Sequence, residues 1–266
     1  MDWSETFASC FVDVRGQPIH YVASTVPADP HPTLVLVHGV GLSHRYLMPY
    51  AVRLAKYFRV FVPDQPGFGL SYKPQRTLTL PELADWIADW MEAIGLEQAA
   101  LMGNSVGCQV LVNLAVRHPH RVLRAVLQGP TIDPAAGTFW QQWRRWYRNR
   151  TEERSTDKGP IVERDYWECG PGRLIRTFRY ALEDHTEELY PQMKCPTLVV
   201  RGALDPIVPQ EWAEEVTRRL PNGRLIVLPG VPHTANLEAP LELLRVTKPF
   251  FEEERQPAEM SVGRLS

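Results

Sequence analysis

The stretch AALMGNSVGCQVLVNLAVRH at residues 99–118 decides the fold. It begins with a short apolar run and continues, from residue 106, with apolar side chains at helical spacing, so a strand turns into a helix within Gly103–Gly107. The turn has the pattern G-x-S-x-G around Ser105, in the strand–turn–helix context that this motif requires. Glycines on both sides let strand and helix approach closely. The stretch therefore predicts a nucleophile elbow that presents Ser105 at the carboxyl edge of a sheet, in preference to an ordinary Gly/Ser turn.

Short apolar runs like the one at 99–102 recur at regular intervals along the chain and read as buried strands. Helical patterns lie between them. The predicted strands are 11–14, 19–23, 33–37, 59–62, 99–102, 124–127, 197–200 and 224–228, and the predicted helices are 46–58, 79–95, 106–118, 211–220 and 241–253. Alternating strands and helices predict an α/β protein with a mainly parallel sheet.

The alternation stops between Thr131 and Lys194, where no buried strand is predicted. This segment holds half of the eight tryptophans and reads as a helical insertion after the sixth strand. We therefore divide the chain into a first core part (1–130), a helical cap insertion (131–194), a second core part (195–253) and a flexible tail (254–266).

Composition excludes several classes of protein. The 266 residues are 44% hydrophobic and 23% charged, as in a globular protein, and the net charge of −2 gives no case for nucleic-acid binding. Four scattered cysteines fit a reducing compartment, and the amino terminus has no basic segment followed by an apolar run. No uninterrupted span of about 20 apolar residues occurs. We expect a cytoplasmic monomer or homodimer without a secretory signal, a transmembrane helix or a membrane partner.

A serine nucleophile needs a base, and His233 follows the last predicted strand, at the sheet edge where Ser105 emerges. The base needs an orienting carboxylate. Asp205 follows the strand at 197–200, and the order Ser105, Asp205, His233 is that of the Ser…Asp…His architecture. Asp133 is a rival acid because it follows the strand at 124–127. We favour Asp205.

An HG-x-G turn begins at His38, directly after the strand at 33–37. In this architecture such a turn supplies one amide of an oxyanion hole, and the residue after the nucleophile supplies the other. We assign these amides to Val40 and Val106. His38 itself is expected to hydrogen-bond neighbouring loops. No motif indicates a metal or a cofactor, because the glycine pattern at 39–41 lacks a Walker lysine and a G-x-G-x-x-G continuation.

Two further motifs make the sequence similar to the α/β-hydrolase superfamily. Residues 64–71 look like the family's D-x-P-G-x-G-x-S loop, and residues 233–240 resemble its H-x-x-x-x-E-x-P ending. The resemblance covers about residues 11–253 apart from the insertion, which occupies the position of the family's cap. It implies the α/β-hydrolase fold and a Ser-His-Asp triad.

Within this family the resemblance implies a serine hydrolase that cleaves a small, apolar or aromatic carboxylic ester through an acyl-enzyme. Gly-Asn-Ser at 103–105 also resembles enzymes that hydrolyse C–C bonds of meta-ring-fission dienoates. Those enzymes usually have a more glycine-rich loop after the first histidine and a tryptophan where this chain has Thr234, so ester hydrolysis is the first choice. A non-catalytic, ligand-binding relative is the third alternative.

In the insertion, Phe139, Trp143 and Tyr147 recur at i, i+4 spacing and form one aromatic stripe. This stripe either packs the insertion onto the core or forms a wall of the substrate pocket. We expect at least one of Trp140, Trp143 and Trp146 to line the pocket. Four arginines nearby, at 144, 145, 148 and 150, either bind a substrate carboxylate or form a solvated face.

Overall fold

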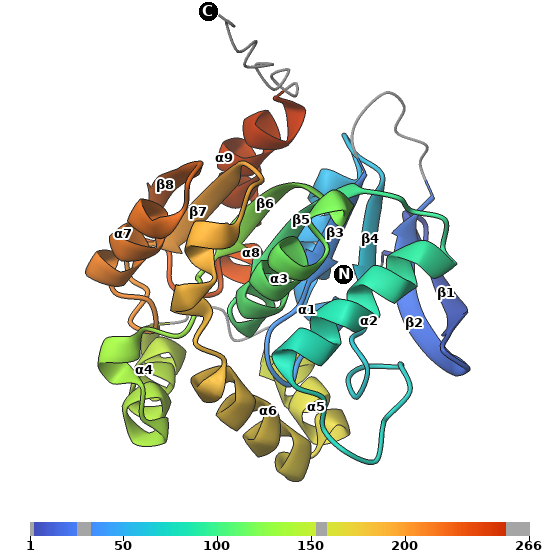
Figure 1. The fold of residues 1–266 in the computed structure, drawn as a ribbon, viewed down its shortest axis with the longest axis horizontal. Coiled ribbons are helices and arrows are strands. Elements are labelled where there is room, and N and C mark those ends of the chain that lie inside the picture. The colour runs from blue at the N-terminus through green and yellow to red at the C-terminus, as the bar shows by residue number, and fades with distance from the viewer. Residues whose placement is uncertain (1–2, 26–32, 153–158, 254–266) are drawn as a thin grey trace, which may run out of the picture.

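The computed structural model describes residues 3–25, 33–152 and 159–253, so the predicted tail at 254–266 lies outside the described residues. Eight strands form one sheet in the order β1-β2-β4-β3-β5-β6-β7-β8 (Figure 1). They are β1 (Phe7–Val14), β2 (Gln17–Ser24), β3 (Leu34–Val37), β4 (Val60–Pro63), β5 (Ala99–Asn104), β6 (Val122–Gln128), β7 (Thr197–Gly202) and β8 (Gly223–Leu228). β2 pairs antiparallel with β1 and with β4, and all other pairs are parallel. The prediction of a mainly parallel α/β sheet is confirmed.

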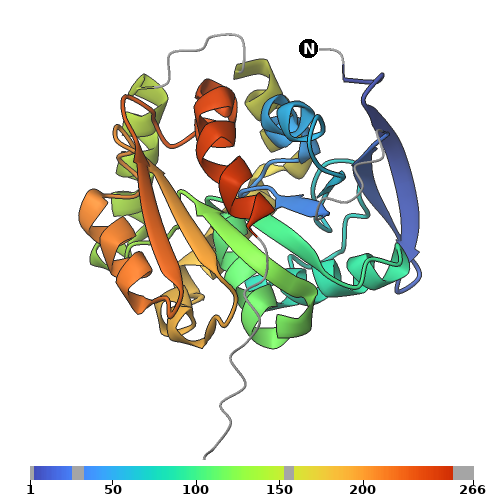
Figure 2. The same ribbon diagram turned by 90° about the horizontal axis from the view of Figure 1, so that it is seen from above.

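Helices cover both faces of this sheet (Figure 2). One face carries α1 (His44–Leu54), α8 (Ala235–Glu238) and α9 (Pro240–Glu252), and the other carries α2 (Leu80–Ala93), α3 (Val106–Arg117) and α7 (Gln210–Arg219). The central strands are buried on both sides, which explains their continuous apolar runs. Across the described ranges, no helix combines the length and the apolar composition that crossing a bilayer takes.

The strand β1 begins at Phe7, four residues before the predicted start at 11. Its first half contains exposed or partly exposed small and polar side chains, because β1 lies at the edge of the sheet. The strand pairs with β2 along its whole length, from Phe7 opposite Ser24 to Val14 opposite Gln17. Backbone pairing at an edge therefore extends the strand beyond the part that hydrophobicity identifies.

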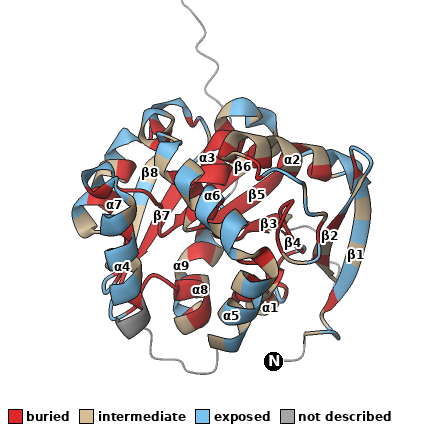
Figure 3. Ribbon diagram, turned by 90° about the horizontal axis from the view of Figure 1, so that it is seen from below, coloured by how far each residue is buried: buried red, intermediate tan, exposed pale blue. Residues whose placement is uncertain are grey.

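A helical insert lies between β6 and β7, as predicted. We use this name for α4 (Phe139–Glu152), α5 (Gly159–Cys169) and α6 (Pro171–Glu183). The three helices gather at one end of the sheet (Figure 1), and much of their outer surface is exposed (Figure 3). On α1, Arg45 pairs with Asp165 at 2.8 Å and with Glu168 at 2.9 Å, which joins α5 to the core.

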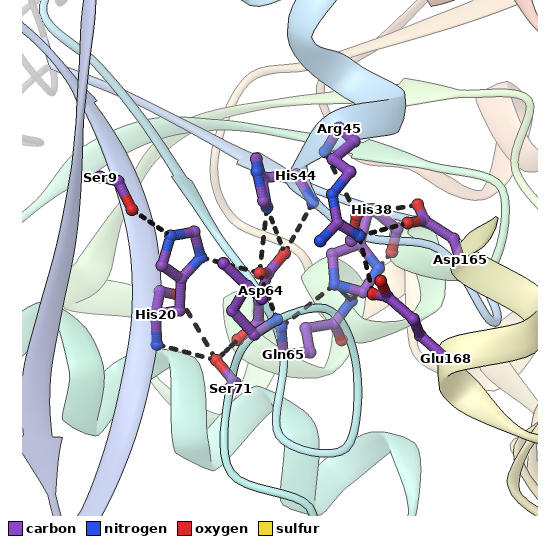
Figure 4. A network of polar contacts seen from close by, with 12 residues as sticks. Ser9, His20, His38, His44, Arg45, Asp64, Gln65, Ser71, Asp165 and Glu168 are labelled. Carbon is purple, nitrogen blue, oxygen red and sulfur yellow. Dashed lines mark hydrogen bonds and ion pairs between the residues drawn. The ribbon is translucent and has the colours of Figure 1, made fainter. Parts of the chain in front are cut away.

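A buried carboxylate, Asp64, fixes the loop after β4 (Figure 4). Its two oxygens lie 2.8 Å from Nδ1 of His20 and 3.0 Å from Nδ1 of His44. They also accept the backbone N–H groups of His44 and Leu70. Burial alone would raise the pKa of Asp64, but the hydrogen bonds from His20 and His44 outweigh it and hold this pKa far below its usual range.

Replacing Asp64 with asparagine is expected to lower the free energy of unfolding by about 2–4 kcal/mol at pH 7, because two buried imidazoles lose a charged acceptor. The loss should shrink as the pH falls below about 4. A depressed carboxyl pKa stabilises the folded state above the unfolded-state pKa, about 3.9, and this stabilisation disappears as the pH falls toward the folded-state value. Urea denaturation at several pH values measures both effects.

The matched control is Asp85→Asn. Asp85 pairs with Arg117 at 2.7 Å on the surface, so we expect its loss to cost less than about 1 kcal/mol. Equal losses in the two variants would contradict the special role of Asp64.

Candidate functional site

The predicted elbow joins β5 to α3 with Ser105 at its tip. Ser105 has φ 55° and ψ −125°, a backbone conformation that is strained for a residue with a side chain. A Cβ at Gly103 would lie 2.7 Å from the backbone nitrogen of Cys108, and one at Gly107 would lie 2.7 Å from the carbonyl oxygen of His38. Both glycines are therefore required by close packing of the helix and strands, as the motif predicts.

His233 follows β8 and is buried together with Asp205, which follows β7. Oδ2 of Asp205 lies 2.7 Å from Nδ1 of His233. The other carboxylate oxygen accepts the backbone N–H groups of Ile207 at 2.8 Å and Val208 at 3.0 Å. The carboxylate is thus fixed by its own loop and directs its second oxygen at the imidazole.

The rival acid, Asp133, has different partners. Its Oδ1 accepts the backbone N–H of Ala135 at 2.9 Å, and its Oδ2 pairs with Arg145 of α4 at 2.8 Å. Asp133 thus caps a short helical turn and holds α4, and the geometry favours Asp205 as the partner of His233.

Two backbone N–H groups have the properties expected of oxyanion-hole donors. Among the described residues, neither the N–H of Val40 nor that of Val106 has a hydrogen-bond partner. The turn that carries Val40 packs on the elbow, since a Cβ added at Gly39 would lie 3.3 Å from the Cβ of Ser105. Both residues of the predicted pair are therefore close to the predicted nucleophile.

His38 is buried and has a structural role, as predicted. The backbone N–H of Gln65 donates to its Nε2 at 3.1 Å, which ties the turn at 38–41 to the loop after β4 (Figure 4). Burial lowers the pKa of His38 and favours the neutral imidazole that this acceptor role requires.

A cavity of about 350 Å³ opens beside Ser105 and His233. The turn at 39–40 and Leu42 form part of its wall, and α5, the loop at 233–234 and α8 form another part. From α4, Trp146 and Asn149 complete the lining. The structure thus brings together Ser105, His233 and Val40 at one enclosed space beneath the helical insert.

The tryptophans of α4 lie on different sides of the helix. Trp146 lines the cavity, but Trp140 and Trp143 do not, and they are 73% and 46% exposed. The two exposed rings lie 6.2 Å apart, and Trp143 stacks on Tyr147 at 5.8 Å. The expectation of an inward aromatic stripe is therefore corrected: Trp143 and Tyr147 point outward.

Polar contacts explain this orientation of α4. Its inner face carries Gln142, Arg145 and Asn149, at helical spacing. The side-chain amide of Gln142 donates to the carbonyl of Ala136 at 2.9 Å, and Arg145 pairs with Asp133. These contacts turn the apolar stripe away from the core, which the apolar pattern alone does not predict.

Two positioning residues were missed in the sequence. At the end of β6, the amide of Gln128 accepts a hydrogen bond from Asn104 and donates to the carbonyl of His233 at 2.7 Å. The N–H of His233 donates to Oδ1 of Asn149 at 3.2 Å. A polar residue at the carboxyl end of an apolar strand is the signal that identifies Gln128, whereas nothing in the sequence marks Asn149.

Among the described residues, His20, His44 and Asp64 form a group whose ligand atoms lie within 4.8 Å of one another, a spacing that suits a metal ion. Both imidazoles direct Nδ1 at the carboxylate, and Nε2 of His20 lies 2.9 Å from Oγ of Ser9. The atoms that would bind a metal are already engaged in hydrogen bonds with one another or with Ser9. We therefore assign the group a structural role in holding the loop after β4.

Two models of protein families match most of the chain. The sequence model described as "alpha/beta hydrolase fold" matches residues 32–168, and one described as "TAP-like protein" matches residues 179–241. A probable 1-acylglycerol-3-phosphate O-acyltransferase of Oryza sativa subsp. japonica is 34% identical over 152 residues, which are 54% of this chain but only 35% of that protein. The chain thus spans about a third of this relative's length.

A pimeloyl-[acyl-carrier protein] methyl ester esterase of Aeromonas hydrophila is 27% identical over 82% of this chain and 95% of its own length. Among solved structures, a bacterial membrane phospholipase A superposes with a TM-score of 0.78 at 22% identity, over 92% of this chain and 86% of that one. The match at residues 32–168 spans just over half of the 266 residues and includes both the elbow and the turn at 38–41. This chain belongs to the α/β-hydrolase fold family.

Proposed function

We propose that the protein is a serine hydrolase that cleaves small carboxylic esters through an acyl-enzyme intermediate. One observation carries the proposal: Ser105, on a strained elbow, lines the same cavity as His233, whose Nδ1 lies 2.7 Å from Asp205. A serine, an imidazole and a buried carboxylate in this relation are the groups that acyl transfer requires.

In the proposed reaction, Oγ of Ser105 attacks the ester carbonyl while Nε2 of His233 takes the hydroxyl proton. Asp205 accepts the Nδ1–H of His233, which sets the tautomer and stabilises the imidazolium. The N–H groups of Val40 and Val106 donate to the oxyanion. His233 then protonates the leaving alcohol, and water, activated by the same imidazole, releases the acid from Ser105.

The cavity indicates the size and polarity of the substrate. A volume of about 350 Å³ is near the small end of ligand pockets, and the lining includes Leu42, Trp146 and Val162. We therefore propose an ester with a short apolar or aromatic acyl group. The relative from Aeromonas hydrophila, a methyl ester esterase that aligns over most of both chains, supports ester chemistry.

The runner-up is hydrolysis of a C–C bond in a meta-ring-fission dienoate. It uses the same serine, so the site geometry does not separate the two reactions. The residue after His233 is Thr234, which lines the cavity where those enzymes usually have a tryptophan. The third alternative, a non-catalytic binding protein, predicts ligand binding without turnover.

One experiment separates the three. The protein is treated with a fluorophosphonate, the labelled peptide is identified by mass spectrometry, and turnover is measured on p-nitrophenyl esters of graded chain length and on one meta-cleavage dienoate. Label on Ser105 with fastest turnover of short esters supports the proposal. Preferred cleavage of the dienoate supports the runner-up. Absence of both labelling and turnover would contradict both enzyme hypotheses.

Replacing Trp146 with alanine is expected to shift the preferred acyl chain toward longer esters and to raise KM for the best short ester about tenfold, because one wall of the cavity is removed. Initial rates across the ester series measure the change. Trp143→Ala is the matched control, since Trp143 lies outside the cavity on the same helix. An unchanged substrate ranking in Trp146→Ala would assign selectivity to another wall.

A further inference from the structure

A second cavity of about 450 Å³ lies on the other side of the Asp205 loop and shares no lining residue with the first. It is formed between α4, the end of β7 and the start of α7. Its lining includes four arginines: Arg144, Arg145 and Arg148 from α4, and Arg201 from β7. We call this space the arginine cavity.

Guanidinium groups outnumber carboxylates in the lining of the arginine cavity. Only two of its lining residues are acidic, Asp205 and Glu211, against four guanidinium groups. The carboxylate of Asp205 is already engaged by His233 and by two backbone N–H groups. Arg145 pairs with Asp133, which lies outside the lining.

Arg201 is the most informative of the four, since it is only 7% exposed. Its hydrogen bonds go to uncharged oxygens: the carbonyls of Val208 at 2.6 Å and Asp205 at 3.2 Å, and Oε1 of Gln210 at 3.2 Å. Within the part of the chain that the structure describes, no carboxylate pairs with it at 4.0 Å or less. A buried guanidinium without a paired carboxylate is costly, and a bound anion would offset this cost.

We propose that the arginine cavity binds a phosphate group, as inorganic phosphate or as a phosphomonoester. Guanidinium groups bind phosphate oxygens through paired, charge-assisted hydrogen bonds. A phosphomonoester carries a charge of about −1.5 to −2 near neutral pH, which suits a lining in which guanidinium groups outnumber carboxylates. The cavity volume leaves room for a small organic group beside the phosphate.

The site also bears on the proposed ester chemistry, because α4 borders both cavities. Arg145 and Arg148 line the arginine cavity, while the residue directly after each of them, Trp146 and Asn149, lines the first cavity. A phosphate held between α4 and the start of α7 would fix the helix that carries these two lining residues.

Binding is tested by isothermal titration calorimetry, with sodium phosphate, glycerol 3-phosphate and, as an ionic-strength control, sodium chloride. The variant Arg144→Gln/Arg148→Gln removes two exposed cavity arginines. The variant Arg176→Gln/Arg179→Gln removes the same charge from exposed positions on α6. We expect phosphate and glycerol 3-phosphate to bind wild type and the α6 variant equally, and the α4 variant about tenfold more weakly or worse.

Tighter binding of glycerol 3-phosphate identifies a phosphomonoester as the ligand, and tighter binding of inorganic phosphate identifies the free ion. No heat beyond the chloride control in wild type, or equal weakening in both double variants, would overturn the proposal. The single variant Arg144→Gln, with circular dichroism to check folding, covers the case in which the double α4 variant does not fold. Because the readout is binding, the result does not depend on whether the ester proposal holds.

Discussion

Ser105→Ala is expected to reduce kcat on p-nitrophenyl esters by on the order of 10⁶, by analogy with loss of the serine in a serine protease triad. The reaction as proposed has no other nucleophile in the cavity. The thermal midpoint should change little, because alanine and serine are equally strained at φ 55° and the serine side chain is not fully buried. Steady-state rates and a thermal melt measure the two quantities on one preparation.

Ser9→Ala is the control for this experiment. Ser9 lies exposed on the edge strand β1, and its hydroxyl contacts His20. We expect this variant to keep the parent's kcat. Full activity in Ser105→Ala would refute the mechanism, whereas a large loss of thermal stability in that variant would show that the elbow hydroxyl also has a structural role.

Asp205→Asn is expected to lower kcat by on the order of 10⁴, as the same change does in a serine protease triad. An asparagine still has a carbonyl oxygen for the N–H groups of Ile207 and Val208, so the loop is expected to keep its shape. Its amide nitrogen, however, cannot accept the Nδ1–H of His233. The imidazole then adopts the wrong tautomer, and KM should change much less than kcat.

Asp133→Asn tests the rival assignment with the same chemical change. Asp133 pairs with Arg145 and caps a short turn, so its loss should weaken the attachment of α4 and leave kcat within about tenfold of the parent. A larger loss of kcat in Asp133→Asn than in Asp205→Asn would move the orienting acid to the loop after β6.

The core could be predicted from the sequence because its signals are local. A buried strand shows as a continuous apolar run, and the elbow requires glycines on both sides of Ser105, so both are visible without knowledge of the fold. The order of strands then places the segments that follow β7 and β8 at one edge of the sheet, which is why Asp205 and His233 are found as a pair. The length of β1 was underestimated because edge pairing needs no apolar run.

The helical insert could be predicted as helical, but the orientation of its helices could not. Apolarity places the stripe through Trp143 and Tyr147 inward, whereas the inner face of α4 is held by polar contacts with Ala136, Asp133 and His233. The apolar pattern does not reveal such contacts, and the partner of Asn149 lies 84 residues away along the chain. The sequence does not join Arg201 to the arginines of α4, because it lies more than 50 residues after them.

The hydrogen bond from the N–H of His233 to Asn149 has a consequence for protein engineering. Inserts of this kind are attractive units to transplant between relatives when a new substrate range is wanted. Here the backbone of His233 depends on an acceptor that the insert supplies, so a graft without one at that point of the helix would disturb the core it is placed on. Chimaeras should therefore keep the inner face of α4 and the Asp165 of α5 that pairs with Arg45, and vary the exposed outer side of α4.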